Sequence, residues 1–445
     1  MRTVYRCASA WIGSGVQHDV DIAVDDGRIS AVTPAAPGTR ADVELPGVVL
    51  PGFANAHSHA FHRALRGRTH GDGGTFWTWR DRMYRVAGVL DPDSYYGLAR
   101  AVYGEMTLAG VTSVGEFHYV HHQPGGAAYA DPNAMGEALR HAARDAGLRL
   151  TLLDTCYLSG GLAAQGHLPL APEQLRFTDG TAEAWASRVS ALSDDATTRV
   201  GSAIHSVRAV PRSSISTVVG ATGDRPLHAH LSEQVAENDA CVGYYGITPT
   251  RLLDDCGALL PTATAVHATH LTDDDVARLG RARTSSCFCP TTERDLADGI
   301  GPAPALRAAG SPLCLGSDQH AVIDLIEEAR ALEMHERLVS HARGTLQPAD
   351  LVAALTESGH RSLGWGDAGR IEVGQRADLV AVRLDTVRTA GSLPEQVLLS
   401  AFAADVDTVV VDGRVVVTGG VHTSMDVATE LRSTITDVWR AAVGA

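Results

Sequence analysis

Short apolar segments of the strand type alternate with amphipathic helical stretches through the middle of the chain. The candidate strands are 48–56, 111–118, 149–156, 199–205, 226–231, 263–268, 284–289 and 312–317. The stretches with helical periodicity are 133–147, 181–194, 323–340 and 348–358. Eight strands that are each followed by a helix or a crossover predict an α/β fold, the (β/α)₈ or TIM barrel.

Both ends of the chain are rich in short β segments. An Asp-Gly turn joins 20–24 to 28–32, and a second joins 408–411 to 414–417. Asp-Gly between apolar runs favours a β-hairpin. Residues 371–374 and 377–382 form another hairpin-like pair.

From this pattern we expect two domains. A small β-sandwich would be built from both termini, residues 1–50 and 366–445, and the barrel would comprise residues 51–365.

Chemically reactive side chains gather where the candidate barrel strands end. They are His57 and His59, then Glu116, His118 and Tyr119, then His205, His228, His230, His267 and Asp318. Barrels of this type carry their chemistry at the C-terminal ends of the strands. Random placement of 20 histidines would not put them at the ends of five strands, so the pattern predicts an active site.

The first two of these residues, His57 and His59, are separated by one residue, which is the spacing of a metal site. Side chains two residues apart in an extended chain point to the same face, about 7 Å apart. Neutral imidazoles can therefore close on one metal ion. His-x-His alone is a weak signal, and the other strand ends strengthen it.

Composition limits the class of protein and its partners. The chain has 445 residues, 44% hydrophobic and 20% charged, with a net charge of −15. This composition predicts a globular protein without nucleic acid or an anionic membrane as partner. No apolar run approaches the length of a membrane span, the start lacks a signal-peptide core, and seven scattered cysteines are typical of the cytoplasm.

The chain contains no lysine, so all 37 basic residues are arginines. Schiff-base chemistry, a pyridoxal-phosphate lysine and a Walker-A lysine are thereby excluded.

The strings LPGFANAHSH, HAHLSE, VHATH and GSD resemble the amidohydrolase superfamily, in the deaminase branch that binds one metal. The resemblance implies the ligands His57, His59, His230 and Asp318 around one divalent ion per subunit, Zn²⁺ or iron. It implies Glu233 as the proton shuttle, with His267 and Asp318 assisting the reacting water. Binuclear relatives use a carboxylated lysine at the end of strand 4, and here that strand ends at His205.

Five more strings are similar to the members of this superfamily that deiminate N-formimino-L-glutamate in histidine degradation. They are HSHAFHRAL at 57–65, FWTWRDRMYR at 76–85, EFHYVHH at 116–122, HSVRAV at 205–210 and TTERDLADGI at 291–300. The resemblance implies the products N-formyl-L-glutamate and ammonia, a homodimer, and substrate contacts from Arg80, Tyr119, His205, Arg208 and His62. His62 is a departure, because the relatives carry glutamine there.

Two other functions stay open. The first is a related aminohydrolase that acts on a heterocyclic base or cyclic amidine, which a mouth lined by aromatic and amide groups would favour. The second is an inactive binding protein, which predicts the loss of a site residue, although none is lost. We expect His70, His121, His122 and His270 in loops or at the surface, His228 in the core, and Glu116 either orienting a histidine or simply buried.

Overall fold

The computed structural model describes residues 2–36, 38, 40–71 and 76–444, and for 76–78 the backbone alone. One sheet has eight parallel strands in the order β14-β13-β12-β11-β10-β7-β6-β5. Their bounds are β5 (Phe53–Ser58), β6 (Val111–His118), β7 (Arg149–Cys156), β10 (Thr198–Ile204), β11 (Leu227–Leu231), β12 (Ala263–His267), β13 (Ser285–Phe288) and β14 (Leu313–Leu315). The predicted (β/α)₈ barrel is confirmed.

The barrel closes between its last and first strands through a single β-bridge from Ser58 to Asp318. The amide of Asp318 donates to the His57 carbonyl at 3.0 Å, and the amide of His59 donates to the Asp318 carbonyl at 3.2 Å. The residues that close the ring therefore lie among the predicted metal ligands.

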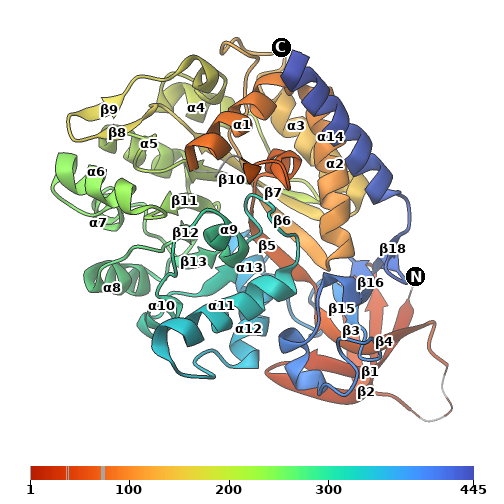
Figure 1. The fold of residues 1–445 in the computed structure, drawn as a ribbon. Coiled ribbons are helices and arrows are strands. Elements are labelled where there is room, and N and C mark those ends of the chain that lie inside the picture. Colours follow the sequence, from red (N-terminus) through yellow and green to blue (C-terminus); the bar gives the residue numbers. More distant parts are fainter. Residues whose placement is uncertain (1, 37, 39, 72–75, 445) are drawn as a thin grey trace.

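Helices separate consecutive strands and surround the barrel (Figure 1). They are α1 (Phe76–Val89), α2 (Pro92–Leu108), α3 (Ala134–Ala146), α4 (Ala182–Val189), α5 (Arg212–Thr222), α6 (Val235–Tyr245), α7 (Pro249–Asp255), α8 (Asp273–Ala282), α9 (Pro290–Asp295), α10 (Ala303–Ala309), α11 (Leu325–Ser340), α12 (Pro348–Leu355) and α13 (Glu357–Ser362). Shorter elements are η1 (Ala60–Leu65), η3 (Pro172–Phe177) and the hairpin β8 (Gly161–Ala163) and β9 (Gly166–Leu168).

A second sheet of eight strands combines both ends of the chain, in the order β18-β17-β16-β15-β4-β1-β2-β3. The strands are β1 (Thr3–Ile12), β2 (Gly15–Asp25), β3 (Arg28–Pro34), β4 (Val43–Pro51), β15 (Leu379–Val382), β16 (Val406–Val411), β17 (Arg414–Thr418) and β18 (Val421–His422), with η4 (Pro394–Leu399) and η5 (Ala403–Asp405) between them. A Cβ added at Gly413 would lie 3.2 Å from the Gly27 Cα, so the two hairpin turns touch. The sheet thus folds over its own core as a β-sandwich.

Two predicted elements are wrong. The segment 48–56 is two strands that belong to different sheets and are separated at Gly52. The backbone passes close to the barrel there, since a Cβ added at Gly52 would lie 2.4 Å from Thr112 Oγ1. Residues 371–374 form no strand and bond to the end of the first hairpin instead, with the Gly374 amide donating to the Ile29 carbonyl at 2.8 Å. β15 pairs with β4 and β16.

A buried ion pair joins the two parts of the molecule. Arg149, at the start of β7, pairs with Asp378, just before β15, and its Nη1 lies 3.0 Å from Asp412 Oδ1. The last helix, α14 (Val427–Gly444), lies on α1 and α2, where the Trp439 indole donates to the Ala64 carbonyl at 2.7 Å. These contacts cross the boundaries at 50/51 and 365/366, and the division stays a proposal. α14 packs on the barrel, although the division assigns it to the β-sandwich domain.

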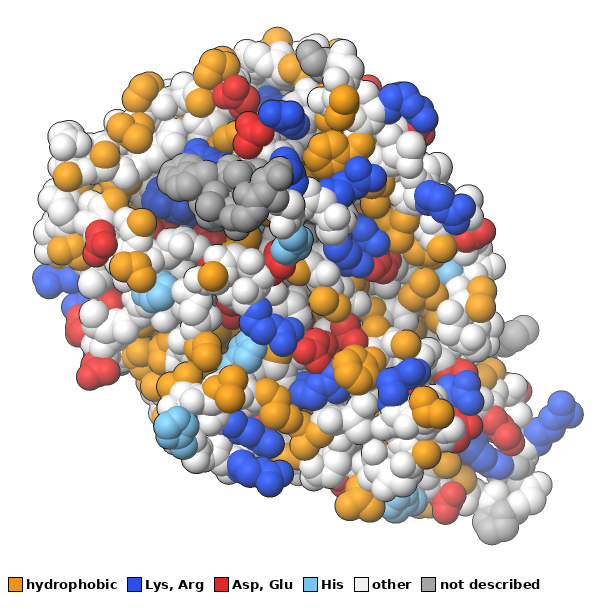
Figure 2. Space-filling view, in the orientation of Figure 1, with side chains coloured by type: hydrophobic (Ala, Val, Ile, Leu, Met, Phe, Trp, Pro, Cys, Tyr) orange, Lys and Arg blue, Asp and Glu red, His pale blue; other side chains and the backbone are white. Residues whose placement is uncertain are grey.

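The surface seen in Figure 2 carries acidic and basic side chains interspersed with apolar ones. In the described ranges, no helix combines the length and the apolar character that crossing a bilayer requires.

Candidate active site

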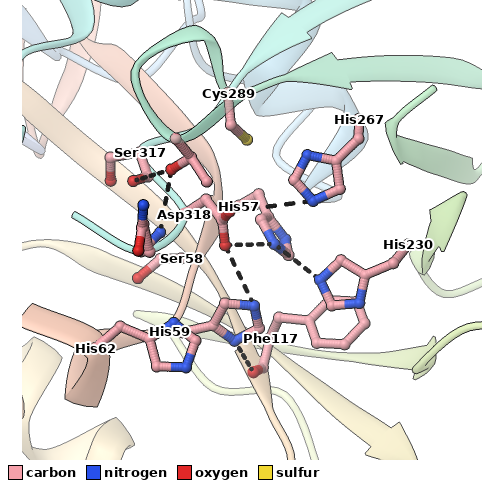
Figure 3. Close-up of polar contacts among 12 residues, drawn as sticks. His57, Ser58, His59, His62, Phe117, His230, His267, Cys289, Ser317 and Asp318 are labelled. Carbon is pink, nitrogen blue, oxygen red and sulfur yellow. Dashed lines mark hydrogen bonds and ion pairs between the residues drawn. The ribbon is translucent and has the colours of Figure 1, made fainter. Parts of the chain in front are cut away.

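Four side chains converge at the C-terminal ends of the barrel strands (Figure 3). The Nε2 atoms of His57 and His230 lie 3.2 Å apart. Asp318 Oδ1 lies 3.2 Å from His57 Nε2 and 3.4 Å from His59 Nε2. All four side chains are buried. The structure therefore brings the four predicted metal ligands together.

Two of these imidazoles are oriented by backbone carbonyls. Nδ1 of His59 lies 2.9 Å from the Phe117 carbonyl, and Nδ1 of His230 lies 2.8 Å from the His205 carbonyl. Because a carbonyl oxygen only accepts, each Nδ1 carries the proton and donates it. The unprotonated Nε2 of each neutral ring then faces the centre of the cluster.

Electrostatics favour a cation in this cluster. Burial lowers the pKa of His57 to about 3 and holds the pKa of His230 well below its usual range. Burial alone would raise the pKa of Asp318, but the neighbouring histidines, led by His57, lower it on balance. Neutral imidazole nitrogens facing one another beside a carboxylate fit a divalent metal ion, for which these are common ligands.

Glu233 and His267 lie beside the ligands. His267 Nε2 is 3.9 Å from Glu233 Oε1 and 4.0 Å from Asp318 Oδ2. Burial would lower the pKa of His267, but Glu233, Glu293 and Asp318 together raise it to about 10. His267 has φ +70° and Asp318 has φ +42°, in the left-handed region that side chains rarely adopt. Such backbone is typical of functional sites, because the fold must hold it in place.

The cluster forms the floor of a cavity of about 140 Å³. Five aromatic side chains line its walls: Trp79, Tyr84, Tyr119, Tyr157 and Phe177. The predicted substrate residues line it as well: His62, Arg80, Tyr119, His205 and Arg208.

Each of the predicted substrate contacts also bonds within the protein. His62 Nε2 and the Tyr119 hydroxyl lie 2.9 Å apart, and Arg80 Nε donates to the Tyr84 hydroxyl at 2.8 Å. Arg208 Nη2 donates to Glu233 Oε2 at 3.1 Å. The Arg208 guanidinium thereby connects the substrate wall to the expected proton shuttle.

The histidines outside this cluster have structural partners. His228 lies in the core as expected, its Nε2 donating to the Ser362 carbonyl at 3.0 Å. His270 Nε2 lies 2.7 Å from the Asp298 carbonyl, and the exposed His70 pairs with Asp295 at 2.7 Å.

His121 and His122 lie in the loop after β6, as expected, but both are buried rather than at the surface. His121 Nε2 donates to the Thr155 carbonyl at 2.9 Å, and His122 Nε2 lies 2.9 Å from Asp179 Oδ1. The loop after β6 folds back into the protein, and its histidine-rich sequence did not predict that these residues would be buried.

Of the two roles expected for Glu116, the structure shows a buried, hydrogen-bonded carboxylate rather than one that orients a histidine. It is fully buried and accepts from Ser58 Oγ and from the Ala60 amide, both at 2.7 Å. Burial raises its pKa to about 7. It fixes the backbone on either side of His59 rather than the imidazole itself.

Sequence reasoning missed two buried glutamates that contact the site. Glu237 Oε2 lies 3.4 Å from Arg208 Nε, and Glu293 Oε1 lies 3.5 Å from His267 Nδ1. Glu237 lies four residues after Glu233, on the first turn of α6, and this spacing is the one signal that could have identified it. Glu293 lies in TTERDLADGI, and only the fold brings it to His267.

Known proteins resemble this chain over nearly its whole length. The amidohydrolase family model matches residues 48–416. A formimidoylglutamate deiminase of Pseudomonas aeruginosa is 37% identical over 415 residues, 89% of this chain and 90% of that protein. An 8-oxoguanine deaminase of the same species is 30% identical over 422 residues, 92% of this chain and 91% of that protein. The crystal structure of an amidohydrolase from Brucella melitensis superposes with a TM-score of 0.91 at 29% identity, covering 98% of this chain and all of that one.

Proposed function

The chain belongs to the amidohydrolase family and is a hydrolase of the deaminase type, and from that premise we propose that it hydrolyses N-formimino-L-glutamate to N-formyl-L-glutamate and ammonia. The observation that carries the proposal is the pair of guanidinium groups, Arg80 and Arg208, on the wall of the cavity whose floor is the histidine cluster. The substrate has the matching layout, an amidine at one end and two carboxylates at the other. Planar guanidinium groups bind carboxylates through paired hydrogen bonds.

The metal in this proposal is one divalent ion per subunit, held by His57, His59, His230 and Asp318. It would act as a Lewis acid and make a water molecule acidic near neutral pH. Imidazole and carboxylate donors suit Zn²⁺, and Fe²⁺ is the alternative.

Glu233 transfers the proton in this proposal. It takes a proton from the attacking water as a general base and delivers it to the departing nitrogen as a general acid. Water adds to the amidine carbon, the bond to the terminal nitrogen breaks, and ammonia leaves. His267, whose Nε2 faces Glu233 and Asp318, donates a hydrogen bond to the oxygen that attacks.

Substrate binding would also release the shuttle. Arg208 Nη2 now donates to Glu233 Oε2 at 3.1 Å. A substrate carboxylate competes with Glu233 for the same guanidinium, so its arrival frees the Glu233 carboxylate to accept a proton.

The wider setting in this proposal is histidine degradation in the cytoplasm by a homodimer. The seven free cysteines support a reducing compartment. Light scattering after size-exclusion chromatography would test the homodimer.

A second candidate is an aminohydrolase of a heterocyclic base or cyclic amidine. The five aromatic side chains of the cavity favour it, because a flat base could stack on them. The similarity to the 8-oxoguanine deaminase supports it as well. An inactive binding protein is the weakest candidate, because all six of the expected ligands and catalytic groups are present.

The deciding experiment mixes metal-loaded protein with N-formimino-L-glutamate and identifies the nitrogen product. Ammonia with N-formylglutamate is the expected result. Formamide with glutamate would mean that the other C–N bond is cut. No turnover would refute the proposed substrate and favour the heterocyclic amidine, with His62 as the first residue to examine.

A further inference from the structure

Glu293 lies behind His267, on the side away from the metal ligands. It is buried, with 3% of its surface exposed, on the first turn of α9. Its Oε1 accepts the Cys289 amide at 2.9 Å and lies 3.5 Å from His267 Nδ1. The carboxylate is therefore held by its own helix and aimed at one nitrogen of the ring.

That nitrogen has no better partner in the described part of the chain. His267 Nδ1 is buried without a well-formed hydrogen bond there. On its other edge, Nε2 faces Glu233 and Asp318. A carboxylate beside Nδ1 repels a lone pair and attracts an N–H, so it favours the ring states that carry a proton on Nδ1 and leaves Nε2 able to carry one as well.

We propose that Glu293 is the positioning residue of His267: its carboxylate accepts the Nδ1 proton and so fixes the ring with Nε2 facing the reacting centre. Glu293 touches neither substrate nor metal ligand, and it acts only through the imidazole. The effect on turnover rests on the proposed function, whereas the orientation of His267 does not.

Glu328 provides a matched control. It is a second buried carboxylate, on α11, and its Oε2 accepts the amide of Thr291 on the first turn of α9 at 2.9 Å. Glu293→Gln and Glu328→Gln each replace one buried carboxylate by an amide of the same shape, but only the first lies against His267.

The first measurement needs no substrate. Zinc-loaded protein labelled with ¹⁵N-histidine is compared by NMR with His267→Asn, which identifies the Nδ1–H signal of His267. We expect that signal to shift or vanish in Glu293→Gln and to persist in Glu328→Gln. An unchanged signal in Glu293→Gln overturns the proposal.

The second measurement is the rate of ammonia release from N-formimino-L-glutamate. In Glu293→Gln, kcat should fall by about 10- to 100-fold, the usual loss when the partner of a site histidine is removed, with KM within about threefold and metal content unchanged. Glu293→Asp, which keeps the charge, should recover part of the loss and serves if the glutamine variant does not fold. A kcat within twofold of wild type in Glu293→Gln overturns the proposal. If wild type itself does not turn over, the proposed function fails and the NMR result alone decides on Glu293.

Discussion

At the scale of single residues, Glu233 has two distinct contacts. One carboxylate oxygen faces His267 and the other accepts from Arg208. Glu233→Gln keeps the shape but removes the base, so turnover should fall by at least about 100-fold, since general acid–base catalysis usually contributes 10²–10⁴. Metal content should stay the same. Metal analysis and initial rates of ammonia release test this, and wild-type turnover in the variant would refute the shuttle assignment.

His62 offers a second test at this scale. Burial holds the pKa of His62 well below its usual range, so the ring is neutral, with one donor and one acceptor nitrogen. Nε2 bonds to the hydroxyl of Tyr119, another residue that lines the cavity, whereas Nδ1 is buried without a partner among the described residues. We expect His62→Ala to raise KM by about 3- to 10-fold, the worth of one neutral hydrogen bond, without loss of metal. A loss of metal would instead make His62 a ligand.

At the scale of elements, the sequence predicts long buried strands best. The strands predicted at 111–118 and 149–156 have those bounds in the structure, where every residue of both strands is buried. The segment 48–56 passes from one sheet to the other at a point that hydrophobicity does not mark. Residues 371–374 alternate like a strand, but they form a turn that bonds to Ile29 at the end of the first hairpin.

The same reasoning explains which parts of the site could be predicted. The strand-end pattern predicts that His57, His59 and Asp318 meet, because strand ends converge at one barrel face, and the family resemblance implies that they are metal ligands. Glu237 and Glu293 were missed because their importance depends on contacts between separate elements.

The end of β14 gives an element-scale prediction. A Cβ on Gly316 would lie 2.7 Å from the Cβ of His57 and 3.0 Å from Sγ of Cys289. Gly316→Ala should therefore displace His57 and weaken metal binding by about tenfold or more, which competition with a chelator measures. Gly220→Ala, in open space on α5, is the control and should leave metal binding unchanged. Equal affinities in both variants would contradict the prediction.

At the scale of the whole molecule, buried neutral histidines govern stability in acid. Burial lowers the pKa of His121, His228 and His360 to about 4, from an ordinary value of 6.5. Between these values the unfolded chain binds protons that the native protein does not. The free energy of unfolding should therefore fall as the pH drops from 6.5 to 4, with no further loss from these groups below that range.

Urea unfolding of metal-free protein at a series of pH values tests this. His228→Gln removes one of the titrating groups while an amide can still donate to the Ser362 carbonyl. Its stability should fall less steeply between pH 6.5 and 4 than that of wild type. Identical slopes would mean that His228 does not contribute.

The sheet built from both termini also affects how the chain folds during its synthesis, because its strands come from opposite ends of the sequence. β4 has β1 beside it early, but its other edge pairs only with β15, about 330 residues later. At the usual translation rate of 5–20 residues per second, that edge stays unpaired for about 15 to 65 seconds during synthesis. An unpaired strand edge is a template for another chain. The nascent protein is therefore most prone to aggregate through this sheet, which is completed last.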